Sequence, residues 1–439
     1  MNFGPHHGER AVFGSADGSF DRREEAGPSA AAVVLGAGEG TRMRPLTYNR
    51  PKVMLPVLGT PILERIVSSC VEAGILRVII VTGYHEEAIR SHFDKAELGA
   101  QIEYVRQEQQ SGTADAINQV RDLVDERFLA LNGDSLVSPP TLKLIARTAP
   151  DRVVLIGAKR VKEPSNYGIL EVIDDAVVRI TEKPNKPLSD LANLGIYAFE
   201  PDIFECIAET RKSARGEYEI TDAIQSLIDQ GYPVGYTKVE EQWIDIGRPW
   251  DLLSANELLM QTLESANEGI IEPLATLKGV VRIGRGSVIK NGAYVTGPVI
   301  IGEGCEIGPN CLLRAGACIG SRVKIGNAVE VKNSIIMDES KIGHLSYVGD
   351  SIIGVRCNFG AGTTVANLRF DEKRIKLGGA DTGRRKLGVI MGDDVRTGIN
   401  SMINVGTSIG PGSTLGVGAV AAGVYPPGSR IESKSATPQ

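Results

Sequence analysis

The chain has 439 residues, of which 42% are hydrophobic and 23% are charged, and its formal net charge is −6. This composition argues against a largely disordered chain, and the acidic balance argues against a general nucleic-acid-binding protein. Because no apolar run is long enough to cross a bilayer and the six cysteines include no C-x-x-C pair, we expect a soluble cytoplasmic protein that does not enter a membrane and has neither a zinc framework nor a disulfide scaffold.

Changes in composition divide the chain into four segments. Residues 1–29 are polar and punctuated by glycine, so we expect a disordered N-terminal extension. Residues 30–262 alternate short β-branched runs, such as AAVVLGAG and RVIIVTG, with amphipathic helical stretches, which predicts an α/β domain with a mostly parallel sheet. Residues 263–431 are a glycine-rich repeat region, and residues 432–439 are a short C-terminal tail.

The repeat region has a period of six residues. Between Gly279 and Gly428 lie 29 of the 51 glycines of the chain. The apolar positions of the first run are Ile283, Ile289, Val295, Ile301, Ile307, Leu313, Ile319, Ile325 and Val331, and the period resumes at Met391, Thr397, Ile403, Ile409, Leu415 and Ala421. This period predicts a parallel β-helix, in which each hexad forms one flat face of a triangular coil and its aliphatic residue points inward. We expect the glycine that follows the aliphatic residue to support a corner that needs positive φ.

The repeat breaks between Ala366 and Lys386, which predicts a loop ejected from the coil. This segment holds seven Lys and Arg residues against three acidic residues. It is either a solvated loop or a contact for an anionic ligand.

A glycine-rich turn follows the first predicted strand, in the segment LGAGEGTRMRPLTYNRPKV. Gly36, Gly38 and Gly40 allow the backbone to pass close to a phosphate with its N–H groups exposed. A dinucleotide-binding fingerprint would have glycine where Thr41 stands, and no Gly-Lys-Ser/Thr of a P-loop follows. Among the basic residues that follow the turn are Arg42, Arg44 and Lys52. Such a cluster neutralises the triphosphate charge that phosphoryl and nucleotidyl transfer must handle.

This block, with its G-x-G-x-G-T-R-M-x-P-L-T run followed by Pro51-Lys52, resembles the signature of the sugar-1-phosphate nucleotidyltransferases. The resemblance covers about Ala31 to Met260 and implies a Rossmann-like domain in which a sugar-1-phosphate attacks the α-phosphorus of a nucleoside triphosphate and releases pyrophosphate. It implies that Arg42 and Lys52 are catalytic. It also implies a nucleotide-binding set, whose last three members lie in the segment that contacts a pyrimidine base: Leu35, Gly36, Ala37, Gly38, Gly40, Thr41, Gln107, Gly112 and Thr113.

Further motifs follow in the order of that family. In NYGIL, TEKP and NLGIY the resemblance implies a sugar-phosphate-binding set of Tyr167, Gly168, Glu182, Lys183, Asn193 and Gly195. Asp134 in LNGDS and Asp245 in WIDIGRP resemble the two metal-binding carboxylates of the family. An aspartate after an apolar run is by itself more often a helix cap, but Mg²⁺ prefers hard oxygen ligands, often one or two carboxylates plus substrate phosphates. We therefore expect these two aspartates to be metal ligands.

His344 is the only histidine of the repeat region and stands in the segment SKIGHLSYVGDSIIGVRCNFGAGTT. The segment resembles the acetyltransferase domain of the bifunctional N-acetylglucosamine-1-phosphate uridyltransferases, which implies a left-handed β-helix. His344 would then be the general base for an amino-sugar nitrogen that attacks acetyl-CoA, a task that suits an imidazole near neutral pH. The resemblance implies that the sugar phosphate is bound by Arg314, Lys332, Tyr347 and Asn358, and that Ala361 and Lys373 contact acetyl-CoA.

Three functions are compatible with these patterns. The preferred one is a two-site enzyme that acetylates glucosamine-1-phosphate with acetyl-CoA and then, with Mg²⁺, transfers uridylyl from UTP to give UDP-N-acetylglucosamine. The alternative is a monofunctional nucleotidyltransferase for a sugar such as glucose-1-phosphate, with UTP or dTTP, whose β-helix only assembles the oligomer. The third is an inactive scaffold, which the presence of Arg42, Lys52 and Asp134 disfavours. The basic insertion resembles the archaeal bifunctional branch, and by analogy with left-handed β-helix acyltransferases we expect a homotrimer.

Overall fold

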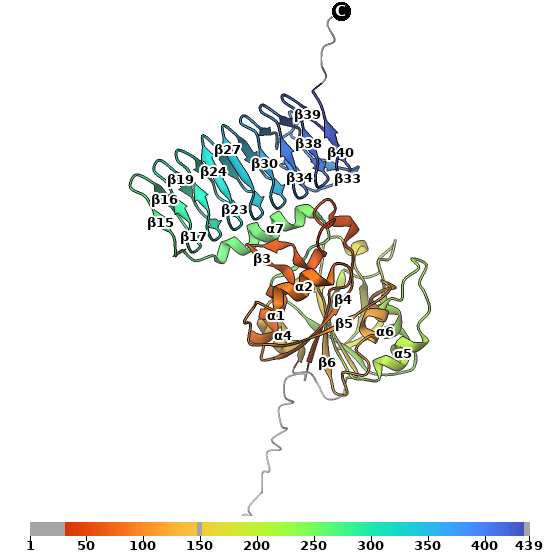
Figure 1. The fold of residues 1–439 in the computed structure, drawn as a ribbon. Coiled ribbons are helices and arrows are strands. Elements are labelled where there is room, and N and C mark those ends of the chain that lie inside the picture. Colours follow the sequence, from red (N-terminus) through yellow and green to blue (C-terminus); the bar gives the residue numbers. More distant parts are fainter. Residues whose placement is uncertain (1–30, 147–151, 434–439) are drawn as a thin grey trace, which may run out of the picture.

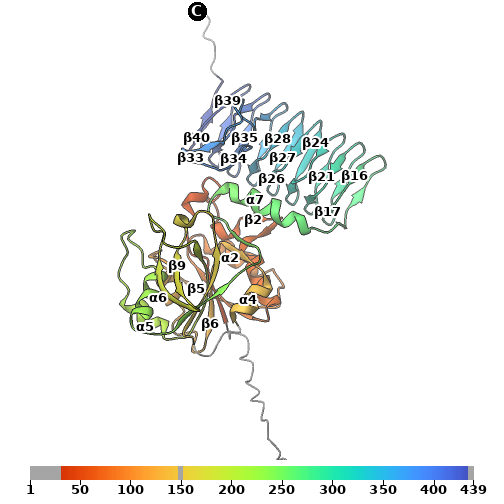
Figure 2. The same ribbon diagram turned by 180° about the vertical axis from the view of Figure 1, so that it is seen from behind.

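The computed structural model describes residues 31–146 and 152–433. The predicted N-terminal extension and residues 434–439 of the predicted tail lie outside the described residues. An α/β domain occupies the N-terminal half, and a β-helix follows it (Figures 1 and 2). No helix within the described ranges is both long and apolar enough to cross a membrane.

The α/β domain is built on a nine-stranded sheet with the order β5-β4-β1-β6-β11-β8-β12-β10-β9. Its strands are β1 (Ala31–Leu35), β4 (Arg77–Thr82), β5 (Gln101–Arg106), β6 (Phe128–Asn132), β8 (Val154–Arg160), β9 (Ile169–Ile173), β10 (Ala176–Thr181), β11 (Leu191–Phe199) and β12 (Val234–Lys238). Strands β5, β4, β1 and β6 are parallel to one another, whereas β11 runs antiparallel to both of its neighbours, β6 and β8. The predicted parallel sheet is thus confirmed for its first half, and the second half is mixed.

Helices cover both faces of this sheet, because its strands are apolar on both sides. Along β1, Ala32 and Val34 belong to one buried cluster, and Ala31 and Val33 belong to the cluster on the opposite face. The helices are α1 (Ile62–Glu72), α2 (Glu86–Phe93), α3 (Thr113–Asn118), α4 (Pro139–Ala146), α5 (Ile203–Glu209), α6 (Ile220–Asp229) and α7 (Pro249–Leu259). Two small strand pairs complete the domain: β2 (Pro56–Val57) with β3 (Thr60–Pro61), and β7 (Ser135–Val137) with β13 (Trp243–Asp245).

The repeat region is a left-handed parallel β-helix with three sheets of short strands. The first sheet contains β14 (Ala266–Asn267), β17 (Val281–Ile283), β20 (Val299–Ile301), β23 (Cys318–Ile319), β26 (Ile335–Ile336), β29 (Ile352–Ile353), β34 (Val389–Met391), β37 (Thr407–Ile409) and β40 (Val424–Tyr425). The second contains β15 (Ile270–Ile271), β18 (Val288–Ile289), β21 (Glu306–Ile307), β24 (Lys324–Asn327), β27 (Lys341–His344), β30 (Asn358–Phe359), β35 (Arg396–Thr397), β38 (Thr414–Leu415) and β41 (Arg430–Ile431). The third contains β16 (Thr276–Lys278), β19 (Tyr294–Thr296), β22 (Leu312–Leu313), β25 (Glu330–Lys332), β28 (Tyr347–Gly349), β31 (Thr364–Val365), β36 (Met402–Ile403) and β39 (Val420–Ala421).

The predicted inward positions stack as expected in the first coils. Ile283 pairs with Ile301, and Ile301 pairs with Ile319, each 18 residues further on. The next partner of Ile319 is Ile336, only 17 residues away, because one corner is a residue shorter. The predicted aliphatic residues nevertheless form one buried cluster through the β-helix.

The glycines that follow the inward residues have a different role from the one expected. Most of them, such as Gly284, Gly302 and Gly326, do not adopt positive φ. A Cβ on Gly302 would lie 2.6 Å from the carbonyl carbon of Gly320, and one on Gly326 would lie 1.8 Å from the oxygen of Gly343. Glycine is therefore required there by the close approach of successive coils rather than by a left-handed backbone.

The two domains share a continuous apolar core. The outer face of the first β-helix sheet contributes Ile300, Cys318, Ile335, Ile352 and Ile390 to the buried cluster that also contains residues of α1, α4 and α7. Helix α7 lies between the two domains in both views (Figures 1 and 2). The predicted ejected loop exists, and it carries a short hairpin of β32 (Lys376–Leu377) and β33 (Ala380–Asp381).

Candidate active sites

A cavity of about 1170 Å³ opens at the end of the α/β sheet. Nearly every residue predicted for nucleotidyl transfer lines it: Leu35, Ala37, Gly38, Gly40, Thr41, Arg42, Lys52, Gln107, Gly112, Thr113, Asp134, Tyr167, Gly168, Glu182, Lys183, Asn193, Gly195 and Asp245. Gly36 lies behind this set, where its N–H donates to the carbonyl oxygen of Val81 at 2.8 Å in the sheet. Segments spread over more than 200 residues of sequence are thus brought together at one place.

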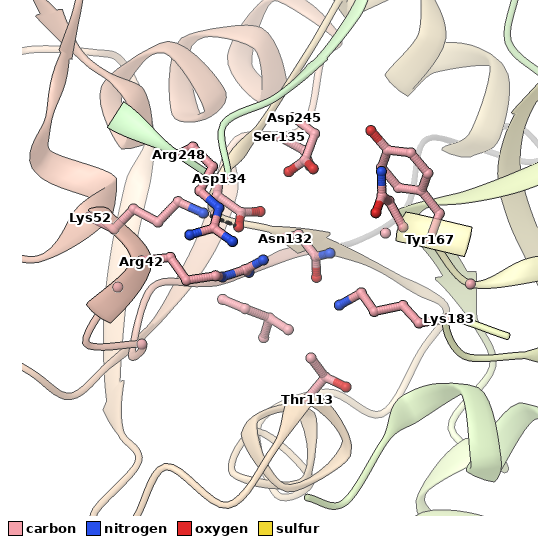
Figure 3. A pocket seen from close by; sticks show the side chains of 18 of the residues that line it. Arg42, Lys52, Thr113, Asn132, Asp134, Ser135, Tyr167, Lys183, Asp245 and Arg248 are labelled. Carbon is pink, nitrogen blue, oxygen red and sulfur yellow. Dashed lines mark hydrogen bonds and ion pairs between the residues drawn. The ribbon is translucent and has the colours of Figure 1, made fainter. Parts of the chain in front are cut away.

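Lys52 and Asp134 form the centre of the site. The Lys52 ammonium lies 2.6 Å from Oδ2 of Asp134, and the lysine side chain is only 10% exposed. Figure 3 shows this pair with the guanidinium groups of Arg42 and Arg248 beside it. This grouping places three cations close to Asp134, which suits a ligand that carries several negative charges.

Gly40 is needed for this arrangement. Its φ is +65°, and a Cβ there would lie 2.8 Å from Cβ of Lys52. The hydroxyl of Thr47 donates to the carbonyl of Gly40 at 2.9 Å and fixes the turn. The glycine-rich turn and the lysine twelve residues later therefore pack directly on each other.

Asp134 and Asp245 fit a divalent cation. Asp134 follows β6, and Asp245, the last residue of β13, pairs with Ser135 of β7, the residue directly after Asp134. Burial, and then the nearby Asp134 carboxylate, raise the pKa of Asp245 to about 6. A carboxylate whose negative charge is disfavoured by burial and by a second carboxylate gains from a bound cation, and both donors are the hard oxygens that Mg²⁺ prefers.

The opposite side of the cavity is lined by the uncharged amides of Asn193 and Gln107 and by charged side chains that include Glu182 and Lys183. Asn193 donates from Nδ2 to the hydroxyl of Tyr197 at 2.7 Å, and its Oδ1 accepts from the N–H of Gly195 at 3.0 Å. Gln107 donates to Asp115 at 2.7 Å, so its amide is fixed against α3. In Figure 3, Lys183 and Tyr167 face the Lys52–Asp134 pair across the cavity.

Several lining residues were not predicted. Arg215 contacts Glu182 at 3.2 Å and Glu219 at 3.3 Å, and its segment SARGEYEIT offered no spacing signal. Arg248 belongs to the WIDIGRP motif and Asp251 lies two residues after it, and Asp251 accepts hydrogen bonds from the backbone N–H groups of Gly247 and Arg248 at 2.9 and 2.6 Å. The motif itself could have indicated these two residues, because one lies inside it and the other directly beyond its end.

The β-helix residues predicted for acetyl transfer divide between two sheets. Arg314 follows β22, and Lys332 and Tyr347 lie in β25 and β28, all on successive strands of the third sheet. Arg314 pairs with Glu330 at 2.8 Å, and Lys332 lies 3.4 Å from the buried carboxylate of Asp350. Exposed His344 ends β27 of the second sheet, at the corner that leads to the third sheet.

Asn358, Ala361 and Lys373 lie elsewhere in the single chain. Asn358 begins β30 of the second sheet and lines a second cavity of about 660 Å³, beside Lys341 and Arg396. Ala361 lies in the next corner, where its carbonyl accepts from the N–H of Asn400 at 2.8 Å. Lys373 is exposed on the ejected loop. One chain therefore assembles three of the predicted sugar-phosphate residues on one face and presents the fourth on another.

The chain is similar to proteins of known family over most of its length. The nucleotidyl transferase family model matches residues 31–262, and the model of the GMPPB C-terminal domain matches residues 295–415. The solved structure of a UDP-glucose pyrophosphorylase complexed with UDP-glucose is 26% identical, has a TM-score of 0.50, and corresponds to 53% of this chain and 99% of its own.

Two relatives align with this chain across both of its domains. The bifunctional protein GlmU of Methanocaldococcus jannaschii is 40% identical over 390 residues, which cover 88% of this chain and 93% of the relative. The bifunctional sugar-1-phosphate nucleotidylyltransferase/acetyltransferase of Sulfurisphaera tokodaii is 39% identical over 397 residues, which cover 89% and 96%. With a nucleotidyl-transfer cavity in one domain and a β-helix in the other, the chain belongs to the family of bifunctional sugar-1-phosphate nucleotidyltransferase/acetyltransferases.

Proposed function

We propose that this enzyme acetylates glucosamine-1-phosphate with acetyl-CoA and then couples the product to UTP, which yields UDP-N-acetylglucosamine and pyrophosphate. The observation that carries the proposal is the joint presence of the cavity around Lys52 and Asp134 and of the Arg314, Lys332 and Tyr347 face beside His344. Each site combines cations that can bind a sugar phosphate with a further functional group, which is Asp134 in the first site and His344 in the second. Family membership supports the two activities. The cations and the histidine at the two sites are the groups that suit sugar-phosphate substrates and acetyl transfer.

In the nucleotidyl site, the chain's own groups bind and align the phosphates. Arg42, Arg248 and Lys52 offset the charge of the triphosphate, and the Gly38–Gly40 turn presents backbone N–H groups. Asp134 and Asp245 would hold Mg²⁺, which supplies charge neutralisation at the phosphates when bound. Because Asp134 also fixes the Lys52 ammonium at 2.6 Å, the cation that meets the phosphates is preorganised.

In the acetyl site, His344 would accept the proton of the amino group as its nitrogen attacks the thioester carbon, and the thiolate of CoA would leave. Arg314 and Lys332 lie on neighbouring coils and would bind the sugar phosphate. Asn358 lies on a different sheet from these residues, which supports a homotrimer in which a neighbouring β-helix completes the site. The acetyl-CoA contacts of Ala361 and Lys373 would form at the same junction.

The test is thiol release from acetyl-CoA, measured with glucosamine-1-phosphate and with galactosamine-1-phosphate for the wild type and His344→Ala. His92→Ala is the control, because His92 pairs with Glu64 at 2.6 Å in the other domain. Thiol release that depends on His344 and not on His92 supports the proposal, and the preferred sugar defines the product. Pyrophosphate release with UTP and with dTTP then assigns the nucleotide.

The monofunctional alternative has one observation in its favour. A relative from Haloferax volcanii, the low-salt glycan biosynthesis nucleotidyltransferase Agl11, is 33% identical over 346 residues, and its name gives only nucleotidyl transfer. If the wild type transfers nucleotide to glucose-1-phosphate but releases no thiol with either amino sugar, this alternative replaces the proposal.

A further inference from the structure

The loop ejected from the β-helix lines the nucleotidyl-transfer cavity of the other domain. Arg374, Asp381 and Thr382 of its hairpin line the same cavity as Asp245 and Arg248. These residues lie more than 110 positions after the end of the nucleotidyltransferase family match at residue 262. The sequence predicted either a solvated loop or an anion contact for this basic segment, and part of the segment lines the phosphate-handling site.

The hairpin is held rigidly where it enters the cavity. Ile375 is 1% exposed, and its N–H donates to the carbonyl of Arg384 at 2.8 Å. Thr382 is also buried, and its hydroxyl donates to the carbonyl of Ile375 at 2.7 Å. Leu377 and Ala380 pack against the apolar core that both domains share. These contacts fix the backbone between residues 375 and 384.

Arg384 clamps the hairpin to the α/β domain. Its side chain is 16% exposed and donates from Nη1 to the hydroxyl of Ser254 at 2.9 Å, while Nη2 pairs with Glu257. Both partners lie on α7, and α7 begins directly after Arg248 of the cavity. The clamp therefore ties the position of the hairpin to the element that carries the cavity wall.

Among the hairpin residues that line the cavity there is one cation, Arg374, and one anion, Asp381. The guanidinium of Arg374 lies 3.8 Å from Asp381, and the two side chains are 67% and 51% exposed. An exposed pair at this distance contributes little to stability, so its members are available to a ligand. Under the proposed function, the ligands of this cavity carry negatively charged phosphate groups. Such groups attract Arg374 and repel Asp381.

We propose that the hairpin of residues 374–383 is a wall of the nucleotidyl-transfer site and that Arg374 binds a phosphate group of the nucleotide or of the sugar phosphate. This assignment rests on the proposed nucleotidyl transfer. It makes the β-helix domain a contributor to the activity of the other domain. Asp381 opposes the same ligand, so the net effect of the hairpin depends on the balance of the two charges.

The test uses two isosteric variants of the full-length protein, Arg374→Gln and Asp381→Asn. Both break the same ion pair, so a purely structural role of the pair predicts changes in the same direction. Direct contact with an anion predicts opposite changes: weaker binding by about three- to tenfold for Arg374→Gln and tighter binding for Asp381→Asn. Arg385→Gln is the matched control, because Arg385 pairs with Glu372 on the same loop and does not line the cavity.

The measurements are calorimetric Kd values for UTP, pyrophosphate and glucosamine-1-phosphate, each with Mg²⁺, and the KM of nucleotidyl transfer. Opposite shifts of the Kd for any one of these ligands, reduced at high salt, support the proposal and identify the phosphate. Shifts in the same direction, or no shift in either variant, overturn it. If the wild type releases no pyrophosphate but the Kd values still shift oppositely, the proposed reaction fails and the phosphate contact stands.

Discussion

Replacing Arg50 by methionine is expected to destabilise the junction of the two domains by about 2 kcal/mol. Arg50 belongs to the α/β domain and pairs with Asp393 of the β-helix, whose side chain is 4% exposed. Removal of one partner of a buried ion pair costs about 3–5 kcal/mol, because the remaining charge is left uncompensated. Asp393 keeps the N–H of Val355 at 2.9 Å and the amide of Asn49 at 3.3 Å, which reduces the expected cost.

The assay is the thermal unfolding midpoint, measured by calorimetry at one protein concentration. For domains of this size, 2 kcal/mol corresponds to a decrease of about 4–8 °C. The double variant Arg50→Met/Asp393→Asn is expected to recover most of this loss, because an asparagine carries no charge and still accepts from Val355. An unchanged midpoint for Arg50→Met, or a double variant less stable than Arg50→Met, would refute the reasoning.

Four further outcomes are expected. Gly195→Ala should lower the thermal midpoint and raise the KM for the sugar phosphate, because φ is +69° and a Cβ would lie 2.0 Å from Nδ2 of Asn132. Leu313→Ala should lower the unfolding free energy of the β-helix by about 2–5 kcal/mol, since the side chain is fully buried, and denaturant titration measures this. Ellman's reagent at pH 8 should find no rapidly reacting thiol in the folded chain and six after denaturation, because all six cysteines are buried and burial raises the thiol pKa, for Cys318 to about 12. Asp134→Ala should abolish pyrophosphate release and leave thiol release from acetyl-CoA unchanged, and loss of both activities in folded protein would contradict two independent sites.

The hexad period predicted the β-helix because the inward side chains recur every six residues and most of them are apolar groups that fit the narrow interior. The period failed first after Val331, where the next inward residue is Ile336, five positions later. Ile335 and Ile336 are both buried, since the outer face of this sheet packs against the α/β domain. Where both faces of a strand are apolar, the alternation that marks the inward residue disappears, so the shorter corner had no signal in the sequence.

The residues of the nucleotidyl cavity were largely predictable because their motifs are short and lie in or next to strands. Asp134 follows β6 and the glycine-rich turn follows β1, and these adjacent parallel strands end at one edge of the sheet. Arg374 and Asp381 were not predictable as cavity residues. Their position depends on how the two domains pack, and a loop sequence carries no information about the surface that a neighbouring domain presents.

The ejected loop also bears on the relation between the two activities. It begins at Asn367, whose amide donates to the Tyr347 hydroxyl at 3.2 Å and to Asp350 at 2.6 Å beside the acetyl-site face, and it ends at the Arg384 clamp on α7. One segment thus touches both sites. Coupling between sites requires an element with two arrangements that each ligand favours differently, and the structure shows one arrangement of this loop, held by hydrogen bonds at both ends. A loop that only positions the two sites predicts that single-site variants separate the two reactions.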